Sequence, residues 1–378
     1  MRPSRQRATL LTLSAIVALG AFGACTDDGA DGDGSDVEAV VAGESFPDAR
    51  CEANRAAGSI TYLSGFDFAA TASIIDVIVA DAAGYYDELC LDVELQPSFA
   101  PANYPVVASG DAQFASGGSF TEVVEFAEAN DADLVAVTVE GRTPIDVLIV
   151  KPGEAEALED LAGSTIGVKT KITPSVAAML ASAGMIEGEE YDTVLLGGFD
   201  PLAHIEIDGI SAFPGYKSNE PGQLERAGID FDVFDPADLD IPGSFGVIYT
   251  TRDFLDENPT AVQDFARATM RGLADALDDP DAAAAAALEL IEANDNPNFL
   301  SLEGETFRWS TDVELITAAV PTDTGVGVPD ADALQEELTA YAEIGLFEAD
   351  DVPQASDRLD PTSLDGVYGD DGTVIWPG

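Results

Sequence analysis

The sequence predicts an α/β protein built of two lobes. From Gly58 onward, short β-type runs alternate with segments of helical pattern, which is the order of a sheet with crossover helices. This part of the chain is about 320 residues long, too long for one small α/β core by the usual size of domains. The alternation predicts sheets that are parallel in most of their length, and the chain length predicts two cores.

The strands and helices follow from local composition and spacing. Candidate strands rich in β-branched and aromatic residues are Ser59–Ser64, Leu91–Gln96, Ala112–Ser116, Leu134–Glu140, Asp146–Val150, Thr165–Lys169, Thr193–Leu196, Gly209–Phe213 and Gly246–Thr250. Candidate helices with apolar residues at helical spacing are Ser73–Gly84, Phe120–Asn130, Pro174–Gly184 and Pro221–Gly228. A longer helix follows Asn258, which is a suitable N-cap before Pro259, and another covers Asp281–Asn294.

The N-terminus has the pattern of a secretory signal. Residues 1–24 carry three arginines, then an apolar run, and no acidic residue. The run is too short to span a membrane stably. It ends at Phe22-Gly23-Ala24-Cys25, which resembles the lipobox of bacterial lipoproteins. We therefore expect a lipoprotein signal peptide over residues 1–24 and an acylated Cys25 that holds the protein at the cell membrane of a bacterium, outside the cytoplasm. Ordinary signal cleavage nearby is the alternative.

Residues 25–57 begin with a stretch of Asp, Gly and Ser, so we expect this segment to be a flexible acidic tether. Two further cysteines, Cys51 and Cys90, lie in a chain that is predicted to be exported. Disulfides persist in such compartments, which makes a Cys51–Cys90 bridge an expectation. The sequence alone does not fix whether the two residues meet.

The charge balance excludes some partners. The chain has 16 basic and 71 acidic residues and a formal net charge of −55, so nucleic acid and anionic lipid are poor partners. Such a surface suggests adaptation to high salt, where counterions screen self-repulsion. Because carboxylates are everywhere, the few cations are more informative. With one histidine and no cluster of cysteine and histidine, the sequence predicts no metal site.

Four motifs in register carry a resemblance to a known family. They are Ala83–Glu94 (AGYYDELCLDVE), Ser109–Phe114, Asp160–Val168 and the segment from Asn258 to Gly272. Each is weak alone, but in this order they resemble the solute-binding proteins of ABC importers for nitrate, sulfonates, taurine and thiamine pyrimidines, over roughly residues 59 to 345.

The resemblance implies a two-lobed type II periplasmic-binding-protein fold with the ligand cleft between the lobes. Lobe one would comprise residues 58–143 and 243–350, lobe two residues 144–242, and a C-terminal tail residues 351–378. It also implies a monomer that closes on a small-molecule ligand without a cofactor and delivers the ligand to permease and ATPase subunits. Ligand contacts should come from loops at the carboxyl ends of strands and from helix N-termini.

In lobe one, three loops are candidate ligand contacts. Phe66, Asp67 and Phe68 follow the first strand, and Phe99 and Tyr104 follow the second; such residues can stack on a planar ring and hydrogen-bond to it. Core packing of these aromatics is the alternative. Ser116 and Ser119 flank a glycine pair after the third strand, which can offer free N–H groups or can simply make a tight turn.

In lobe two, Tyr216, Asn219 and Glu220 form the most specific candidate set. Tyr216 and Glu220 have the spacing with which thiamine-pyrimidine binders of the family stack on and hydrogen-bond the pyrimidine. The alternative is a helix N-terminus where Glu is favoured by the dipole. The loop after the first strand departs from the pyrimidine binders: its aromatic residue is present, but the usual Asn is not.

The lysines support a second ligand class. All four, Lys151, Lys169, Lys171 and Lys217, fall in the predicted lobe two. Lys169 to Ser175, which includes Thr170, Lys171 and Thr173, lies between a strand and a helix and could cradle a sulfonate, carboxylate or phosphate. Equally, these lysines could offset nearby carboxylates.

The sequence favours a receptor over an enzyme. The same fold occurs in a cytosolic pyrimidine synthase of thiamine biosynthesis, which uses an active-site His, a Lys-bound pyridoxal phosphate and a Cys-rich motif. This chain lacks the Cys-rich motif and carries an export signal, and we expect its single histidine, His204, to be a structural or surface residue. A surface adhesin, which would have no small-ligand pocket, is the third class.

Overall fold

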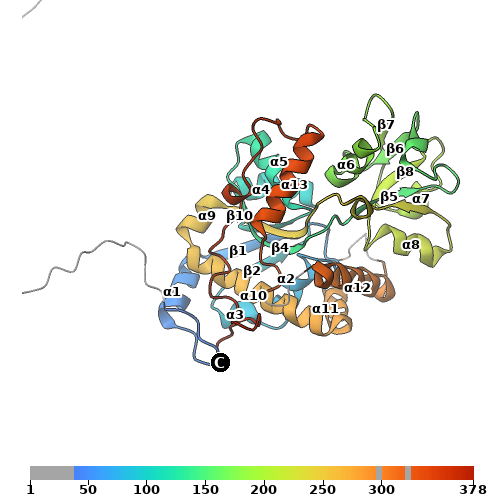
Figure 1. Ribbon diagram of the computed structural model, residues 1–378. Coiled ribbons are helices and arrows are strands. Elements are labelled where there is room, and N and C mark those ends of the chain that lie inside the picture. Colours follow the sequence, from blue (N-terminus) through green and yellow to red (C-terminus); the bar gives the residue numbers. More distant parts are fainter. Residues whose placement is uncertain (1–37, 295–299, 320–324) are drawn as a thin grey trace, which may run out of the picture. The chain divides into compact units, whose positions relative to one another are not determined.

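The computed structural model describes residues 38–294, 300–319 and 325–378. The predicted signal peptide, Cys25 and the first part of the predicted tether lie outside these residues. The described chain forms two five-stranded sheets, each flanked by helices and each belonging to one lobe (Figure 1). The predicted α/β class is confirmed.

The sheet of lobe one has the order β2-β1-β3-β10-β4. Its strands are β1 (Ser59–Leu63), β2 (Asp92–Gln96), β3 (Phe114–Gly117), β4 (Leu134–Gly141) and β10 (Phe245–Thr251). Strand β1 pairs in parallel with β2 and β3, whereas β10 pairs antiparallel with β3 and β4. Only β10 is therefore reversed in this sheet.

The sheet of lobe two has the order β7-β6-β8-β5-β9. Its strands are β5 (Asp146–Val150), β6 (Thr165–Val168), β7 (Asp192–Leu195), β8 (Ala212–Tyr216) and β9 (Asp232–Phe234). Here β5 is the reversed strand, antiparallel to β8 and β9. In each sheet, the reversed strand is the one that the chain forms first after crossing from the other lobe: β5 in lobe two and β10 in lobe one. The remaining strands are parallel to one another, as predicted.

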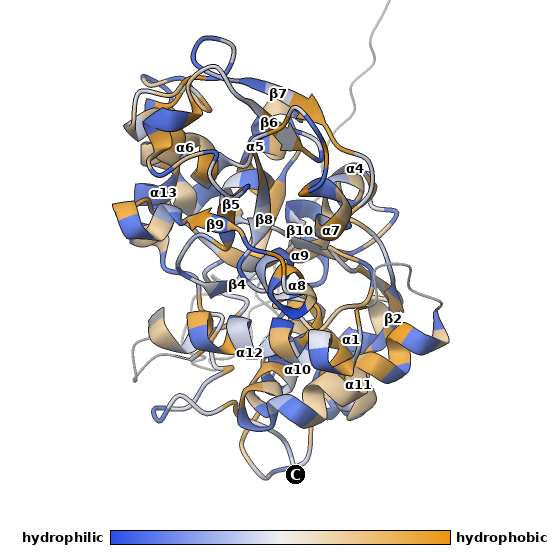
Figure 2. Ribbon diagram, turned by 90° about the vertical axis from the view of Figure 1, so that its right-hand side faces the viewer, coloured by the Kyte–Doolittle hydropathy of each residue, from blue (hydrophilic) through white to orange (hydrophobic). Residues whose placement is uncertain are grey.

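The helices surround these two sheets. In lobe one they are α1 (Asp48–Ala56), α2 (Ile75–Ala82), α3 (Tyr85–Glu88), α4 (Ala100–Ala108), α5 (Phe120–Asn130), α9 (Arg252–Glu257), α10 (Pro259–Asp278), α11 (Pro280–Ala293), α12 (Leu302–Ala319) and α13 (Ala331–Glu343). In lobe two they are α6 (Pro174–Ser182), α7 (Pro201–His204) and α8 (Glu220–Ala227). The hydropathy colouring shows hydrophobic and hydrophilic residues side by side on α10 and α11, as expected for helices that cover a core with one face (Figure 2).

Several sequence predictions need correction in detail. Strand β8 begins at Ala212, three residues later than Gly209 in the prediction, because Gly209 has a φ of +85° that a strand does not accommodate. Asn258 precedes α10 but makes no side-chain cap; its Nδ2 donates instead to the carbonyl of Phe254, 3.3 Å away, at the end of α9. Strand β9 and helices α12 and α13 were absent from the sequence prediction.

Two connections join the lobes side by side. The chain enters lobe two between β4 and β5 and returns between β9 and β10, and the predicted boundaries at residues 143 and 242 fall within these connections. A Cβ at Gly243 would lie 2.7 Å from Cγ of Pro144, so only glycine permits this close approach. The Tyr341 hydroxyl of α13 donates to the carbonyl of Pro242 at 2.5 Å and holds the second connection against lobe one.

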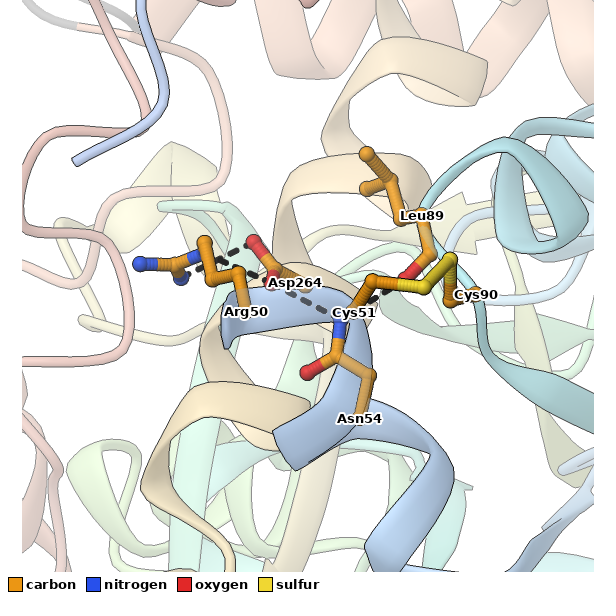
Figure 3. The surroundings of a disulfide bond; sticks show 6 residues. All are labelled: Arg50, Cys51, Asn54, Leu89, Cys90 and Asp264. Atoms are coloured by element: carbon orange, nitrogen blue, oxygen red, sulfur yellow. Dashed lines mark hydrogen bonds and ion pairs between the residues drawn. A yellow bond between two sulfur atoms is a disulfide. The ribbon is translucent and has the colours of Figure 1, made fainter. Parts of the chain in front are cut away.

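The predicted tether is too long at its C-terminal end. Residues 48–56 form α1, and Cys51 and Cys90 form a disulfide that joins α1 to the turn before β2 (Figure 3). The buried Arg50 guanidinium donates to both oxygens of Asp264 on α10, at 2.8 and 2.9 Å, and Asn54 donates to Asp264 as well. These contacts explain why a weakly hydrophobic segment folds against lobe one: its order comes from tertiary contacts that composition does not reveal.

The predicted C-terminal tail is also part of lobe one. Leu359 forms a parallel bridge with Ala136 of β4. Near the end of the chain, the Trp376 indole packs on Tyr85 and donates to Glu88 at 2.9 Å. In the part of the chain that the structure describes, no helix has the length and apolar character needed to cross a membrane.

Candidate ligand-binding site

A cavity of about 410 Å³ lies between the two lobes. Lobe one contributes residues from the loops after β1 and β2 and from α5 and α12, and lobe two contributes the loops after β6, β7 and β8 and the start of β5. Its polar and aromatic lining residues include Phe66, Phe99, Tyr104, Glu122 and Arg308 from lobe one, and Asp146, Lys169, Thr170, Lys171, Thr173, Phe199, His204, Tyr216, Ser218, Asn219 and Glu220 from lobe two. Its volume is in the range of small-molecule sites.

Three phenylalanines meet across the cleft. Phe99 of lobe one and Phe199 of lobe two are stacked with an interplanar angle of 5° and ring centroids 5.3 Å apart. Phe66 of lobe one stands edge-on to both rings, at 5.7 and 5.3 Å. We call Phe66, Phe99 and Phe199 the aromatic trio. It presents ring faces and edges of the kind that hold a planar aromatic molecule.

Tyr216 and Glu220 are placed by the turn from β8 into α8. Glu220 is the first residue of α8 and is 2% exposed, whereas the Tyr216 side chain remains 38% exposed. The backbone N–H of Tyr216 donates to Oε2 of Glu220 at 2.8 Å, and Nζ of Lys169 lies 2.5 Å from Oε1. The residues of the two competing ligand hypotheses are therefore in direct contact.

Glu220 is ionised in this arrangement. Its burial alone would raise the pKa of the carboxyl, but the Lys169 ammonium and the backbone donors outweigh burial and lower that pKa below its ordinary value. Because both carboxylate oxygens already have partners in the protein, Glu220 orients Lys169, whose Nζ lies 4.9 Å from the Phe199 ring centroid. The pair thereby connects the polar wall to the aromatic trio.

Two further carboxyl groups line the cavity without a cation at hydrogen-bond distance among the described residues. Glu122 accepts from the backbone N–H of Ser119 at 3.1 Å, and burial raises the pKa of its carboxyl. Asp146, at the start of β5, accepts from the Ser175 hydroxyl at 3.1 Å. Burial, followed by the charge of Glu122, raises the pKa of Asp146 to about 7.

The other polar residues of the lining are already engaged in part. Lys171 forms an ion pair with Glu125 of α5, which links the lobes at the rim. Arg308 of α12 donates to Oδ1 of Asn219 at 2.8 Å and to both carboxylate oxygens of Glu305, and its guanidinium lies over the Phe66 ring. Asn219 therefore turns its carbonyl oxygen to the protein rather than to the cavity.

Nine of the thirteen sequence-predicted ligand residues line the cavity. They are Phe66, Phe99, Tyr104, Thr170, Lys171, Thr173, Tyr216, Asn219 and Glu220. Sequence reasoning placed Lys169 in the anion cradle as well, and it too lines the cavity.

Four of the predicted ligand residues lie outside the lining. Phe68 is 1% exposed in the core of lobe one, and the buried Asp67 adopts a φ of +45° with its N–H donating to the carbonyl of Ser98. Ser116 shares a hydrogen bond of 2.6 Å with Ser73 beneath the first-strand loop. Ser119 caps α5 by accepting from the N–H of Glu122. Core packing occupies Phe68, the backbone conformation places Asp67, and Ser116 and Ser119 use their hydroxyls within lobe one.

Sequence reasoning missed several residues of the cavity, among them Phe199, Arg308, Glu122 and Asp146. Phe199 follows two glycines in the loop after β7, a signal that could have suggested a presented aromatic. The two acids were hidden among 71 carboxylates. His204, expected to be structural or on the surface, is buried; one ring nitrogen lies 3.1 Å from the carbonyl of Gly197, and the residue borders the cavity.

The family of the chain follows from comparison with known proteins. The model of the family described as NMT1/THI5 like matches residues 71–283, more than half of the chain. The chain belongs to this family. The NMT1/THI5-like match covers residues 71–143 of lobe one, all of lobe two, and helices α9 and α10. It therefore includes most of the residues that line the cavity.

The riboflavin-binding protein RibY of Chloroflexus aurantiacus is 31% identical to this chain over 222 residues, which are 56% of this chain and 61% of RibY. The match thus spans less than two thirds of that relative's length.

Two solved structures show the same fold at low identity. The periplasmic aliphatic sulphonate binding protein SsuA of Escherichia coli aligns with a TM-score of 0.58 at 15% identity, over 79% of this chain and 91% of SsuA. The desulfurization enzyme DSZB aligns with a TM-score of 0.53 at 13% identity, over 81% of this chain and 98% of DSZB. The two-lobed fold is therefore shared by a binding protein and an enzyme.

Proposed function

We propose that this protein is the extracytoplasmic solute receptor of an ABC importer and that it binds a planar nitrogen heterocycle of the flavin or pyrimidine type between its lobes. The observation that carries the proposal is the aromatic trio, in which Phe66 and Phe99 of lobe one meet Phe199 of lobe two beside a cavity of about 410 Å³. A ligand held by aromatic rings from both lobes favours the closed form, because it gains the contacts of both only when they approach.

The charges of the cavity support a heterocycle over a small anion. Lys169 and Lys171, the lysines of the predicted anion cradle, are paired with Glu220 and Glu125. The carboxyl groups of Glu122 and Asp146 face the same space. A nitrate or sulfonate would have to share this space with the charge of Glu220, whereas a neutral heterocycle can form hydrogen bonds with these carboxyl groups.

Riboflavin is the first ligand to test. The name of RibY states that it binds riboflavin, and this relative shares 31% identity with the chain over 222 residues. A pyrimidine precursor of thiamine, which the sequence motif of Tyr216 and Glu220 favours, is the second. Both ligands are planar, carry ring nitrogens and match the aromatic trio in chemistry.

Ligand-dependent thermal unfolding tests the binding proposal. A ligand at a hundred-fold excess over its dissociation constant should stabilise the fold by about 2.7 kcal/mol. Riboflavin or the pyrimidine should raise the melting temperature, while taurine, an alkanesulfonate and nitrate should not. A shift with the anions alone would replace the heterocycle by the sulfonate, taurine or nitrate alternative. No shift with any of the five would count against the whole set.

The same fold in DSZB makes an enzyme the alternative function. The receptor proposal requires that a bound heterocycle be recovered chemically unchanged, since binding and lobe closure involve no bond breaking. Mass spectrometry of the ligand before and after prolonged incubation with stoichiometric protein separates the two. Any accumulating product would favour a pyrimidine-synthase-like or other enzyme.

We further propose that Cys25, in the lipobox-like sequence, carries the acyl chains that hold the receptor at the membrane surface as a monomer. In intact bacterial cells, the Cys25→Ser protein should appear in the soluble extracytoplasmic fraction while the natural protein sediments with membranes. Continued sedimentation of the serine variant would contradict the lipid anchor.

A further inference from the structure

One carboxyl oxygen at the inner wall of the cavity is buried and unpaired. Asp146 is the first residue of β5, directly after the first connection between the lobes, and it pairs in register with Tyr216 of β8. The side chain is 9% exposed and lines the cavity. Its Oδ2 accepts from the Ser175 hydroxyl, whereas no described residue makes a hydrogen bond to its Oδ1.

Such an atom needs a partner, because leaving a buried polar group unsatisfied costs free energy comparable to a lost hydrogen bond. The cavity is the open side. The Thr173 hydroxyl lines the same wall and likewise makes no hydrogen bond of normal length in the described chain, but it lies close enough to Asp146 to lower the pKa of that carboxyl, as Ser175 also does. The wall beside Tyr216 thus holds two neighbouring polar groups that a ligand can reach from the cavity.

The groups around Asp146 favour its neutral form. Carboxylates approach from α5 (Glu122) and from α8 (Glu220), and the phenols of Tyr216 and Tyr341 face the same region. No ion pair within the described residues involves Asp146, since Lys169 is held by Glu220 and Lys171 by Glu125. Burial and the neighbouring Glu122 accordingly raise the pKa of Asp146 to about 7.

The hydrogen bond from Ser175 indicates which oxygen carries the proton when the acid is neutral. Ser175 donates to Oδ2, so Oδ2 is the carbonyl-type oxygen and Oδ1 carries the proton. The neutral side chain therefore presents an O–H donor to the cavity.

We infer that Asp146 is a specificity-determining residue of the cleft, whose Oδ1 donates a hydrogen bond to an acceptor atom of the bound heterocycle, a ring nitrogen or a carbonyl oxygen, beside Tyr216. This inference rests on the proposed function. It adds that, in one contact, the protein donates the hydrogen bond and the ligand accepts it. It selects ligands with an acceptor at that position over isosteres that carry a C–H there.

The consequence is binding that weakens with rising pH. The neutral fraction of an acid with a pKa of about 7 falls about tenfold between pH 6 and pH 8, and affinity for an acceptor falls with it. Conversely, a carboxylate that accepts from a ligand N–H would bind more tightly as pH rises. The direction of the pH profile therefore separates a donating from an accepting Asp146.

The experiment uses the full chain, freed of any co-purified ligand, and riboflavin as the probe. Quenching of riboflavin fluorescence gives the affinity from pH 5.5 to pH 8.5, a range chosen as roughly one and a half units on each side of the expected midpoint. The variants are Asp146→Asn and Asp146→Ala, with Asp232→Asn, an exposed residue of β9, as the control in the same lobe. Thermal unfolding of each variant reports whether it is folded.

The natural protein and the control should lose about tenfold in affinity between pH 6 and pH 8. Asp146→Asn should bind as well as the natural protein at pH 6 and show no pH dependence, because its amide N–H₂ donates at every pH while its oxygen accepts from Ser175. Asp146→Ala should bind about tenfold more weakly at pH 6, the worth of one hydrogen bond.

Other outcomes would overturn the inference. Tighter binding at high pH, together with weak binding by Asp146→Asn, would make Asp146 an acceptor. A flat profile in the natural protein, with equal affinity in all variants, would leave Asp146 as a support for Ser175 at the start of α6. Failure of the natural protein to bind riboflavin or the thiamine pyrimidine would instead contradict the proposed function itself, before any variant is compared.

Discussion

The two lobes are stabilised and equipped in different ways. Lobe one carries the disulfide, the buried Arg50–Asp264 ion pair and the C-terminal segment that packs across it. Lobe two has a smaller core, no disulfide among its described residues, and all four lysines of the chain. Its edge strand β7 leaves Leu195 70% exposed.

This difference indicates how a two-lobed protein can divide its tasks between stability and ligand contact. Lobe one supplies aromatic surface on a strongly braced frame, whereas lobe two supplies most of the polar groups of the cavity. We therefore expect substitutions in the braces of lobe one to change stability and substitutions in the cleft of lobe two to change affinity.

The largest loss should follow Asp264→Ala. Asp264 is fully buried and accepts from Arg50, Asn54 and Arg267, so its removal leaves two buried guanidinium groups without their carboxylate. The free energy of unfolding should fall by about 3–5 kcal/mol. Asp278→Ala, at an exposed position of the same helix, is the matched control for urea unfolding. A loss below about 1 kcal/mol, the range of exposed ion pairs, would show that the buried ion pair of Asp264 does not account for the stability of lobe one.

Opening the disulfide should cost somewhat less. The Cys51–Cys90 bridge closes a segment of 39 residues between α1 and β2, and such cross-links stabilise by about 2–4 kcal/mol. The double substitution Cys51→Ser and Cys90→Ser should lower the unfolding free energy by that amount and leave riboflavin affinity unchanged at temperatures where the variant is folded. An equal loss of affinity would show that α1 also shapes the cleft.

In lobe two, Glu220→Gln should change affinity more than stability. The substitution removes the charge that orients Lys169, and heterocycle binding should weaken by about 1.5–3 kcal/mol, the worth of the hydrogen bond that a misplaced Lys169 ammonium no longer donates to the ligand. Glu225→Gln, exposed on the same helix, is the control for calorimetric titration.

The same variant separates the two ligand classes. If the ligand is a small anion held by Lys169 and Lys171, Glu220→Gln releases Lys169 and should leave affinity unchanged or improve it, while Lys171→Ala should weaken binding. Loss of affinity in the lysine variant alone would overturn the heterocycle proposal.

The smallest effect is expected for Phe199→Ala. Phe199 is the lobe-two member of the aromatic trio, and aromatic pairs contribute about 0.5–1.5 kcal/mol beyond the area they bury. Ligand affinity should fall by that amount, whereas Leu195→Ala, nearby and largely exposed, should leave it unchanged in fluorescence titration. A drop in melting temperature without a change in affinity would make the trio a contact between lobes only.

The sequence determined much of the fold because local patterns encode it. Short β-type runs located β1 to β6 and β10 to within two residues at each end, and helices such as α5 and α10 followed from their apolar spacing. The order of motifs from Ala83 to Gly272 indicates the family without any tertiary contact. Elements without a strong pattern escaped: α1 is held by a buried ion pair and a disulfide rather than by its own hydrophobicity.

The site was decided by the tertiary structure. The contact between Tyr216 and Glu220 could be predicted from the sequence, because the two residues are four positions apart across one turn. It could not bring Lys169 to Glu220, 51 residues away, or Phe199 to Phe99, because sheet order and the two connections between the lobes set these distances. Asp146 is one carboxyl among 71 acidic residues in the sequence. Its burial beside Glu122, which exists only in the folded protein, raises its pKa to about 7 and places it in the cleft.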